Sequence, residues 1–469
     1  MNGWRERIVG LDERLPLLDG RLAPYINLDN AASTPPFQVV ADAVQRFLPF
    51  YSSVHRGTGV KSRLSTAAYD DAHETIARFA GADTRANTVI FVKNTTEAIN
   101  KLAFRFPLPA GSVVLSTAME HHSNDLPWRP RAEVVRAAVT PEGRLDEDDF
   151  DRLLAAYGSR IALVTVSGAS NVTGFVQPVH RLARKAHAVG ARILVDAAQL
   201  AAHRRIDVRA DDDPEHLDYV VLSGHKMYAP FGSGALIGAK DTFLHGAPEH
   251  PGGGTVDVVT PTDVVWAGLP DREEAGSPNV IGAVAMAAAA QMLMGTGMDD
   301  VTQHEIGLTA YALDRLRSIA GVTLYGESVL SDERDRVGVV PFNVGSVPHA
   351  LVAAILGHEA GIGVRSGCFC AQSYVAHLLG LGEREHLLSV DRGDRPGMVR
   401  LSLGIYNTEE DVDALVTMVE RIGRGAHSGD YTRVPATGEY MPSIHRSGFA
   451  AVHPYDYIDK PIPLPTRTA

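Results

Sequence analysis

Cysteine is scarce in this chain: among 469 residues only Cys368 and Cys370 occur, two positions apart. So few cysteines exclude a disulfide framework. No uninterrupted apolar run reaches the length of a membrane-spanning helix, so we expect no transmembrane segment and no membrane partner. The first residues lack an apolar core followed by a cleavage site, which predicts no signal peptide and a cytoplasmic protein.

Basic residues are also too few for a nucleic-acid-binding protein. The 44 Lys and Arg stand against 56 Asp and Glu, and the net charge is -12. Nucleic-acid binders usually carry a basic stripe, which this sequence lacks, so we expect no nucleic-acid partner. The hydrophobic share is 45%, which predicts a large core divided between two domains.

Short β-branched runs alternate with amphipathic segments in the first two thirds of the chain. One such segment spaces Val179, Leu182, Ala183 and Ala186 as on one face of a helix. Alternation of this kind predicts an α/β domain with a largely parallel sheet, whose ligands bind at the carboxyl ends of the strands. The predicted strands are 88–93, 112–117, 133–137, 160–167, 192–196, 218–223 and 234–238.

The domain organisation is predicted from changes in pattern. An Ala-rich run from 281 to 292 indicates a long helix, after which helices and a few strands continue to about residue 424. We therefore expect an N-terminal segment, 1–25, that packs with the small domain, a large domain over 26–295 and a small domain over 296–425. Residues 426–469, rich in Gly, Pro, Ser and Tyr, predict an extended tail.

Two predicted strands end at charged residues. Lys226 follows an apolar strand, where an ammonium group is costly to desolvate. A lysine that forms a Schiff base with a cofactor avoids that cost. Asp196 ends the strand before it, and a carboxylate beside a pyridine nitrogen would let pyridoxal phosphate (PLP) act as an electron sink. A surface lysine and a helix-capping aspartate are the ordinary alternatives.

Two other turns fit the same cofactor. Thr95 and Thr96 follow a strand and open a helix, where backbone N–H groups suit a phosphate, although ordinary capping would explain them too. His121 and His122 follow another strand. Adjacent histidines rarely converge on one metal ion, so we expect no metal here and favour stacking of one imidazole on a planar cofactor, with a role in proton transfer.

Nine segments, in order, resemble the class V aminotransferase family, and within it the cysteine desulfurase and selenocysteine lyase group. The resemblance covers residues 25 to 425. It implies the PLP-dependent transferase fold of type I, with a mostly parallel seven-stranded sheet in the large domain, a smaller α/β domain, and a homodimer with both active sites at the interface. The matching segments are 28–33, 54–57, 94–100, 120–122, 170–174, 196–199, 223–226, 274–279 and 365–371.

The resemblance also implies the residues that bind the cofactor. Lys226 would hold PLP as a Schiff base, with Asp196 at the pyridine nitrogen and His121 stacked on the ring. Gln199 would meet the phenolic oxygen. The phosphate would be held by Thr95, Thr96, Ser223 and His225, with Ser277 reaching the phosphate bound by the other subunit.

For the substrate, the resemblance implies L-cysteine. Asn171 and Arg400 would hold its carboxylate, and Arg365 would lie on the active-site loop, where it favours a thiolate at Cys370. Freed Lys226 would remove the α-proton, and Cys370 would attack the substrate sulfur. Alanine would leave, and a persulfide would remain for transfer to an acceptor protein or small molecule.

The active-site loop departs from the sulfur-mobilisation relatives, which usually have two His where this chain has Cys368 and Phe369. The segment 365–370 instead resembles that of molybdenum cofactor sulfurases, and an extra loop over 380–396 is expected to cover the site. The identity of the sulfur acceptor, and the preference for cysteine or selenocysteine, therefore stay open. Cys368 has two interpretations: it exchanges with the persulfide, or it packs beneath the loop.

Other functions remain as alternatives. A selenocysteine lyase, a C–S lyase, or an epimerase or transaminase of a biosynthetic pathway would belong to the same family, and the lyase, epimerase and transaminase reactions would not need Cys370. A non-catalytic scaffold is disfavoured by the combination of Lys226, Asp196 and His121. A metal module of Cys368, Cys370 and His377 would lack the four ligands usual for structural zinc.

Overall fold

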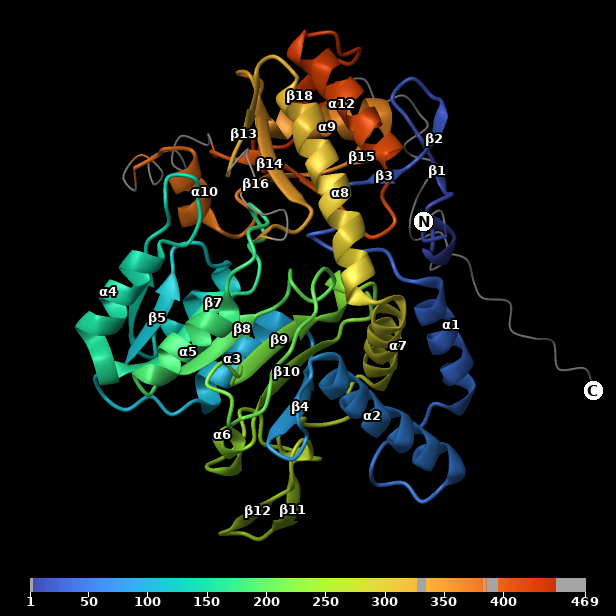
Figure 1. The fold of residues 1–469 in the computed structure, drawn as a ribbon. Coiled ribbons are helices and arrows are strands. Elements are labelled where there is room, and N and C mark those ends of the chain that lie inside the picture. Colours follow the sequence, from blue (N-terminus) through green and yellow to red (C-terminus); the bar gives the residue numbers. More distant parts are fainter. Residues whose placement is uncertain (1–2, 327–334, 383–384, 386–394, 444–469) are drawn as a thin grey trace, which may run out of the picture.

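The computed structural model describes residues 3–326, 335–382, 385 and 395–443. Its larger part is built on a seven-stranded sheet with the order β4-β10-β9-β8-β7-β5-β6 (Figure 1). Only β10 runs antiparallel to its neighbours, so the predicted mostly parallel sheet is confirmed. The strands are β4 (Asn87–Val92), β5 (Val113–Thr117), β6 (Glu133–Ala137), β7 (Ile161–Ser167), β8 (Arg192–Asp196), β9 (Tyr219–Ser223) and β10 (Gly234–Ala239).

Helices cover both faces of this sheet because its strands are apolar on both sides. In β8, Ile193 and Val195 belong to one buried cluster and Leu194 to another, as expected from the alternation of side chains along a strand. The first cluster includes residues of α1 (Gln38–Phe47), α2 (Val60–Phe79), α4 (Glu147–Tyr157), α5 (Val179–Ala188) and α7 (Val280–Thr296), and the second includes α3 (Thr95–Arg105).

The smaller part is built around a four-stranded antiparallel sheet. Its order is β13 (Val322–Leu324), β14 (Val339–Val344), β17 (Met398–Ser402) and β16 (Arg365–Gly367). Arg400 lies on β17, and the loop after β16 carries Cys370. Three helices pack beside this sheet: α8 (Met298–Arg317), α9 (His349–Ala360) and α12 (Glu409–Gly423).

Described segments near both ends of the chain contact this smaller part. Arg5 forms an ion pair with Asp411 of α12, and β3 (Ile26–Asn27) pairs with β15 (Ile362–Gly363). In the expected tail, β18 (Tyr431–Arg433) and β19 (Tyr440–Pro442) form a hairpin that contacts α9, while 444–469 lie outside the described residues. The other strands and α-helices of the described residues are β1 (Arg14–Pro16), β2 (Leu22–Pro24), α6 (Asp241–Leu244), β11 (Val256–Val259), β12 (Val264–Trp266) and α10 (Gln372–Leu378).

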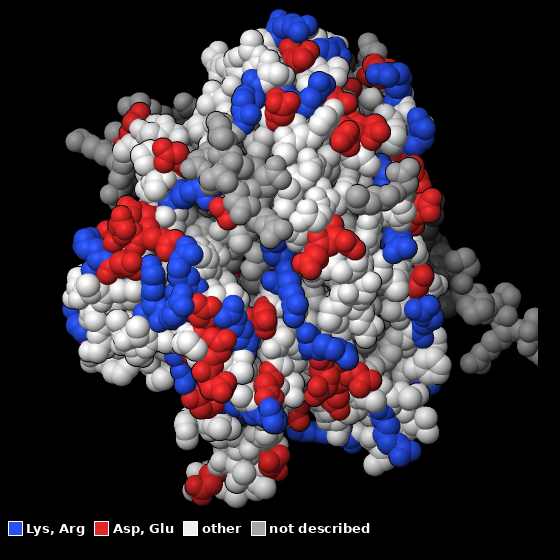
Figure 2. All heavy atoms as spheres, viewed as in Figure 1, with Lys and Arg blue, Asp and Glu red and all other residues white. Residues whose placement is uncertain are grey.

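The described surface mixes charges of both signs. In the view of Figure 2, Lys and Arg side chains are interspersed with Asp and Glu, unlike the basic stripe of a nucleic-acid-binding face. Among the described residues no single helix is long and apolar enough to cross a membrane. Only α7 and α8 taken together reach that length and composition, and they are bent by 79°.

A buried carboxylate joins two histidines at the amino end of β9. Asp218 lies 2.9 Å from Nε2 of His187 and 3.5 Å from Nε2 of His216, and the two rings stack at 4.3 Å. Burial opposes ionisation of Asp218, but hydrogen bonds from both histidines and from the Ile193 N–H lower its pKa to about 2. The hydrogen bond with Asp218 raises the pKa of His216. This cluster therefore stabilises the fold mainly as an ion pair.

Asp218→Asn should lower the free energy of unfolding by about 3 kcal/mol near pH 5, because it removes one partner of a buried ion pair. A lowered acid pKa stabilises the fold above its unfolded value of 3.8, and this contribution is lost as the pH falls towards about 2. The stabilisation that accompanies the raised pKa of His216 is fully present below pH 6.5 and is lost as the pH rises through the pKa of the folded state. The difference from the wild type should therefore be largest between about pH 4 and 6.5.

Urea unfolding at several pH values measures this difference. The matched control is Asp314→Asn, at an exposed position of α8. Its free energy of unfolding should change by about 0.5 kcal/mol or less. An equally small, pH-independent change for Asp218→Asn would contradict the stabilising role of the ion pair.

Candidate active site

A cavity of about 370 Å³ lies at the carboxyl ends of the central strands, between the two parts of the chain. The strand-end residues of β8 and β9 form part of its wall, and Arg400 of β17 closes it from the smaller part. Every predicted site residue except Ser277 lines it: Thr95, Thr96, His121, Asn171, Asp196, Gln199, Ser223, His225, Lys226, Arg365, Cys370 and Arg400.

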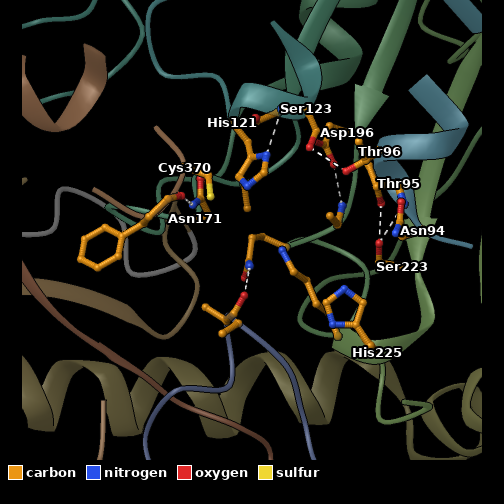
Figure 3. A pocket seen from close by; sticks show the side chains of 18 of the residues that line it. Asn94, Thr95, Thr96, His121, Ser123, Asn171, Asp196, Ser223, His225 and Cys370 are labelled. Atoms are coloured by element: carbon orange, nitrogen blue, oxygen red, sulfur yellow. Dashed lines mark hydrogen bonds between the residues drawn. The ribbon is translucent and has the colours of Figure 1, made fainter. Parts of the chain in front are cut away.

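Hydroxyl groups gather at the amino end of α3. Asn94 caps this helix by accepting a hydrogen bond from the Glu97 N–H. Ser223 Oγ lies 2.8 Å from Thr95 Oγ1 and accepts a hydrogen bond from the Thr95 N–H at 2.9 Å. Thr96 Oγ1 lies 2.7 Å from Ser123 Oγ (Figure 3). Hydroxyls beside a helix amino terminus are suited to bind a phosphate group.

His121 is a neutral imidazole with a fixed orientation. Its Nδ1 accepts a hydrogen bond from the Ser123 N–H at 3.1 Å, so the proton of the neutral ring resides on Nε2. Burial, together with the nearby charge of Lys226, lowers the pKa of His121 to about 4. The ring can therefore stack on a planar ligand without adding a charge.

The Glu120 side chain stabilises the turn that carries His121. Glu120 is buried and accepts hydrogen bonds from Thr117, Asn124 and Ser167, including the Ser167 N–H. These bonds join the turn after β5 to the end of β7. They hold the backbone that carries His121 in place.

Lys226 and Asp196 bring opposite charges to the cavity. Loss of hydration lowers the pKa of Lys226 to about 8, which leaves a larger fraction of its amine free to react near neutral pH. Asp196 is buried, and burial raises its pKa while the Ala198 N–H and Lys226 oppose that shift. Gln199, on the same turn, donates a hydrogen bond to the Ala31 carbonyl at 2.6 Å.

The opposite side of the cavity carries Cys370 (Figure 3). Cys370 is exposed, and it and Phe369 both have positive φ angles, 56° and 52°. This conformation is uncommon for residues other than glycine. Two contacts fix the loop: Asn171 Nδ2 donates to the Phe369 carbonyl at 2.7 Å, and the Cys370 carbonyl accepts from the His122 N–H at 2.7 Å. The thiol is therefore held at the cavity mouth.

Cys368, unlike Cys370, does not line the cavity. It is half-buried, its Sγ donates to the Pro396 carbonyl at 3.0 Å, and burial raises the pKa of its thiol. This favours the packing interpretation over persulfide exchange. His377 contacts the Thr140 carbonyl at 3.0 Å. In the described part of the chain, the residues that lie close enough together to hold a metal ion are His187, His216 and Asp218 instead.

Several residues of the cavity received no role from the sequence. Ser123 and Ser167 line it, and Asp29 contacts both of its arginines. Asp29 lies inside a segment that carries the family resemblance, and Ser123 directly follows another, so their position in the chain was the available signal. Ser277 lines a separate pocket with Tyr69. Most of the extra loop predicted over 380–396 lies outside the described residues.

The fold and this cavity define a class. The chain belongs to the class V aminotransferase family, whose model, aminotransferase class-V, matches residues 26–415. Within the family its group is that of the cysteine desulfurases, and membership implies PLP as the cofactor.

The relatives match over almost their whole length. A cysteine desulfurase of Haloferax volcanii is 37% identical over 426 residues, 88% of this chain and 93% of the relative. A probable cysteine desulfurase of Halalkalibacterium halodurans is 35% identical over 417 residues, 87% of this chain and 95% of the relative. Among solved structures, the cysteine desulfurase CsdA of Escherichia coli has a TM-score of 0.72 at 29% identity, covering 86% of this chain and 96% of that one.

Proposed function

We infer that the protein is a PLP-dependent cysteine desulfurase that converts L-cysteine to L-alanine and keeps the sulfur as a persulfide. The observation that carries this function is the position of Cys370, an exposed thiol on the same cavity as Lys226. A transaminase or epimerase does not need a nucleophile there. The cysteine desulfurase relatives support the same activity.

The residues of the cavity fit PLP. Thr95, Thr96, Ser223 and His225 would hold the phosphate, because all four line the cavity and Thr95 and Ser223 are hydrogen-bonded at the amino end of α3. Lys226 would form the Schiff base. At the ring, His121 would stack, Asp196 would contact the pyridine nitrogen and Gln199 the phenolic oxygen. When bound, the cofactor would stabilise negative charge at the substrate's α-carbon.

The substrate would bind at the other end of the cavity. Arg400 and Asn171 would hold the carboxylate of cysteine, and the Lys226 amine would take its α-proton. The Cys370 thiolate would then attack the sulfur: an S–S bond forms and the C–S bond breaks, leaving its electron pair on carbon. The β-carbon takes up a proton and the α-carbon regains the proton that Lys226 removed, so alanine is released and Cys370 carries the persulfide for an acceptor protein or small molecule.

A product assay tests this function. Purified protein loaded with PLP is incubated with L-cysteine, with and without dithiothreitol, and alanine, sulfide, pyruvate and D-cysteine are measured. Equal amounts of alanine and sulfide in the presence of dithiothreitol are expected. Pyruvate and ammonia instead of alanine would indicate a C–S lyase, and D-cysteine an epimerase. Selenocysteine in place of cysteine tests the selenocysteine lyase alternative.

The active enzyme is proposed to be a homodimer in which Ser277 binds the phosphate of the other subunit. The pocket that Ser277 lines, apart from its own chain's cavity, supports this arrangement. A heterodimer of one Lys226→Ala subunit and one Ser277→Ala subunit should then contain one fully intact site. Its PLP affinity, measured by titrating the cofactor absorption, should equal that of the wild type.

If Ser277 served its own chain, the only reactive site of this heterodimer would carry the Ser277→Ala change. Its PLP affinity would then equal the weakened affinity of the Ser277→Ala homodimer. Sedimentation of the active protein as a monomer would also contradict the proposal.

The domain boundaries near residues 25, 295 and 425 stay predictions.

A further inference from the structure

Two neighbouring histidines in the turn after β5 contact different partners. His121 lines the cavity, whereas His122 does not. His122 instead contacts the loop that carries Cys370, through both its backbone and its ring. Its N–H donates to the Cys370 carbonyl at 2.7 Å, and its Nε2 accepts a hydrogen bond from the Gln372 N–H at 3.3 Å. The two contacts therefore hold the chain immediately after Cys370.

The ring of His122 acts here as a neutral acceptor. Because Nε2 accepts a hydrogen bond, the proton of the neutral imidazole resides on Nδ1. Burial lowers the pKa of His122, while Asp125 opposes that shift and Arg129 adds to it. A protonated ring would carry a donor at Nε2 and would lose the contact with the Gln372 N–H. The lowered pKa therefore preserves the contact near neutral pH.

The loop has a backbone conformation that needs support from outside. Phe369 and Cys370 have φ angles of 52° and 56°, and residues other than glycine keep this costly conformation only where surrounding contacts enforce it. Gln372 is the first residue of α10, and Ala371, which precedes it, has no side-chain oxygen to cap the helix. The His122 ring supplies an acceptor that the loop itself lacks.

The loop belongs to the smaller part of the chain but is held by the larger part. It follows β16, whereas His122 and Asn171 follow strands of the seven-stranded sheet. Asn171 donates to the Phe369 carbonyl, and Tyr374 of α10 shares a buried cluster with Met119. The position of the thiol at the cavity therefore depends on contacts with the turns of the larger part.

We propose that His122 is a positioning residue for the nucleophile: its ring holds the loop so that the Cys370 thiol meets the sulfur of the bound substrate. This proposal rests on the proposed function, in which Cys370 attacks that sulfur. Because His122 does not line the cavity, it acts through the loop and not on the substrate. Its loss should slow sulfur transfer and leave the binding of cofactor and amino acid unchanged.

The test separates binding from sulfur transfer in the PLP-loaded protein. Alanine formation from L-cysteine in a single turnover measures transfer. Titration with L-alanine, followed by cofactor absorption, measures binding without turnover. His122→Ala should lower the alanine rate about tenfold, because one hydrogen bond that places a reacting group is lost. Its dissociation constant for L-alanine should equal that of the wild type.

Two further substitutions at the same position isolate the hydrogen bond. His122→Gln places a side-chain oxygen near the position of Nε2 and should restore the alanine rate to within about threefold of the wild type. His122→Phe keeps an aromatic ring without an acceptor and should show the same loss as His122→Ala. This variant keeps the test decisive if the smaller alanine side chain disturbs folding.

A second histidine of the same helix provides the matched control. His377 of α10 contacts the Thr140 carbonyl at 3.0 Å, and it does not line the cavity. His377→Ala therefore also removes a contact between α10 and the larger part, but not the one beside Cys370. Its alanine rate should remain within about twofold of the wild type.

Hydrogen exchange distinguishes failure of this proposal from failure of the proposed function. The peptide that contains Gln372 should exchange faster in His122→Ala and His122→Phe than in the wild type, and His122→Gln should slow it again. If the wild type released no alanine, the proposed function would fail, and exchange would still report whether the ring holds the loop. An alanine rate for both His122→Ala and His122→Phe within about twofold of the wild type, or no restoration by His122→Gln, would overturn the proposal.

Discussion

Cys370→Ala should stop alanine formation from cysteine while leaving the cofactor in place. The side chain is exposed at the cavity mouth, and the residues proposed to bind PLP lie on other segments. Loss of the thiol proposed to attack the substrate sulfur should lower the rate on the order of 10³-fold or more. Alanine quantification under single-turnover conditions gives this rate, and the absorption spectrum gives the bound PLP.

Cys368→Ala is the matched control, since it removes the other thiol two positions away. Cys368 is half-buried and donates to the Pro396 carbonyl. Its removal should cost some stability and leave both the alanine rate and the persulfide on Cys370 almost unchanged. Mass spectrometry of the loop peptide after one cysteine pulse measures that persulfide. Full alanine formation by Cys370→Ala would exclude Cys370 as the sulfur acceptor and favour another family reaction.

Lys226→Ala should remove both the Schiff base and the group that takes the α-proton. The expected loss of alanine formation is about 10³-fold or more, since general-base catalysis alone contributes about 10²- to 10⁴-fold. The protein should still fold, because Lys226 belongs to a short turn after β9 and not to the core clusters. The yellow absorption of the Schiff base should disappear.

Borohydride reduction checks this assignment directly. In the wild type, reduction should attach the cofactor to the peptide that contains Lys226, and in Lys226→Ala no peptide should be labelled. Lys240→Ala is a suitable control, because its Nζ donates to the Thr84 carbonyl, away from the cavity. A label on another lysine would refute the role of Lys226.

The strands of the large sheet were predictable from local pattern. Each predicted strand agrees with the structure to within one residue at either end, because β-branched runs such as 160–167 are bounded by charged residues and turns. The edge on which Lys226 and Asp196 lie was predictable too. Parallel strands direct their carboxyl ends to the same side, so residues that follow β8 and β9 must meet there.

The sequence by itself thus determined the sheet, the family and most of the residues that line the cavity. Only the tertiary structure decided how Asp29 pairs with Arg365 and Arg400, how Glu120 reaches Ser167, and that Cys368 contacts the Pro396 carbonyl and does not line the cavity. The physical reason is the distance along the chain between the residues that interact. Strand and turn preferences arise between neighbouring residues, whereas these contacts join segments far apart in the chain and exist only after the chain has folded.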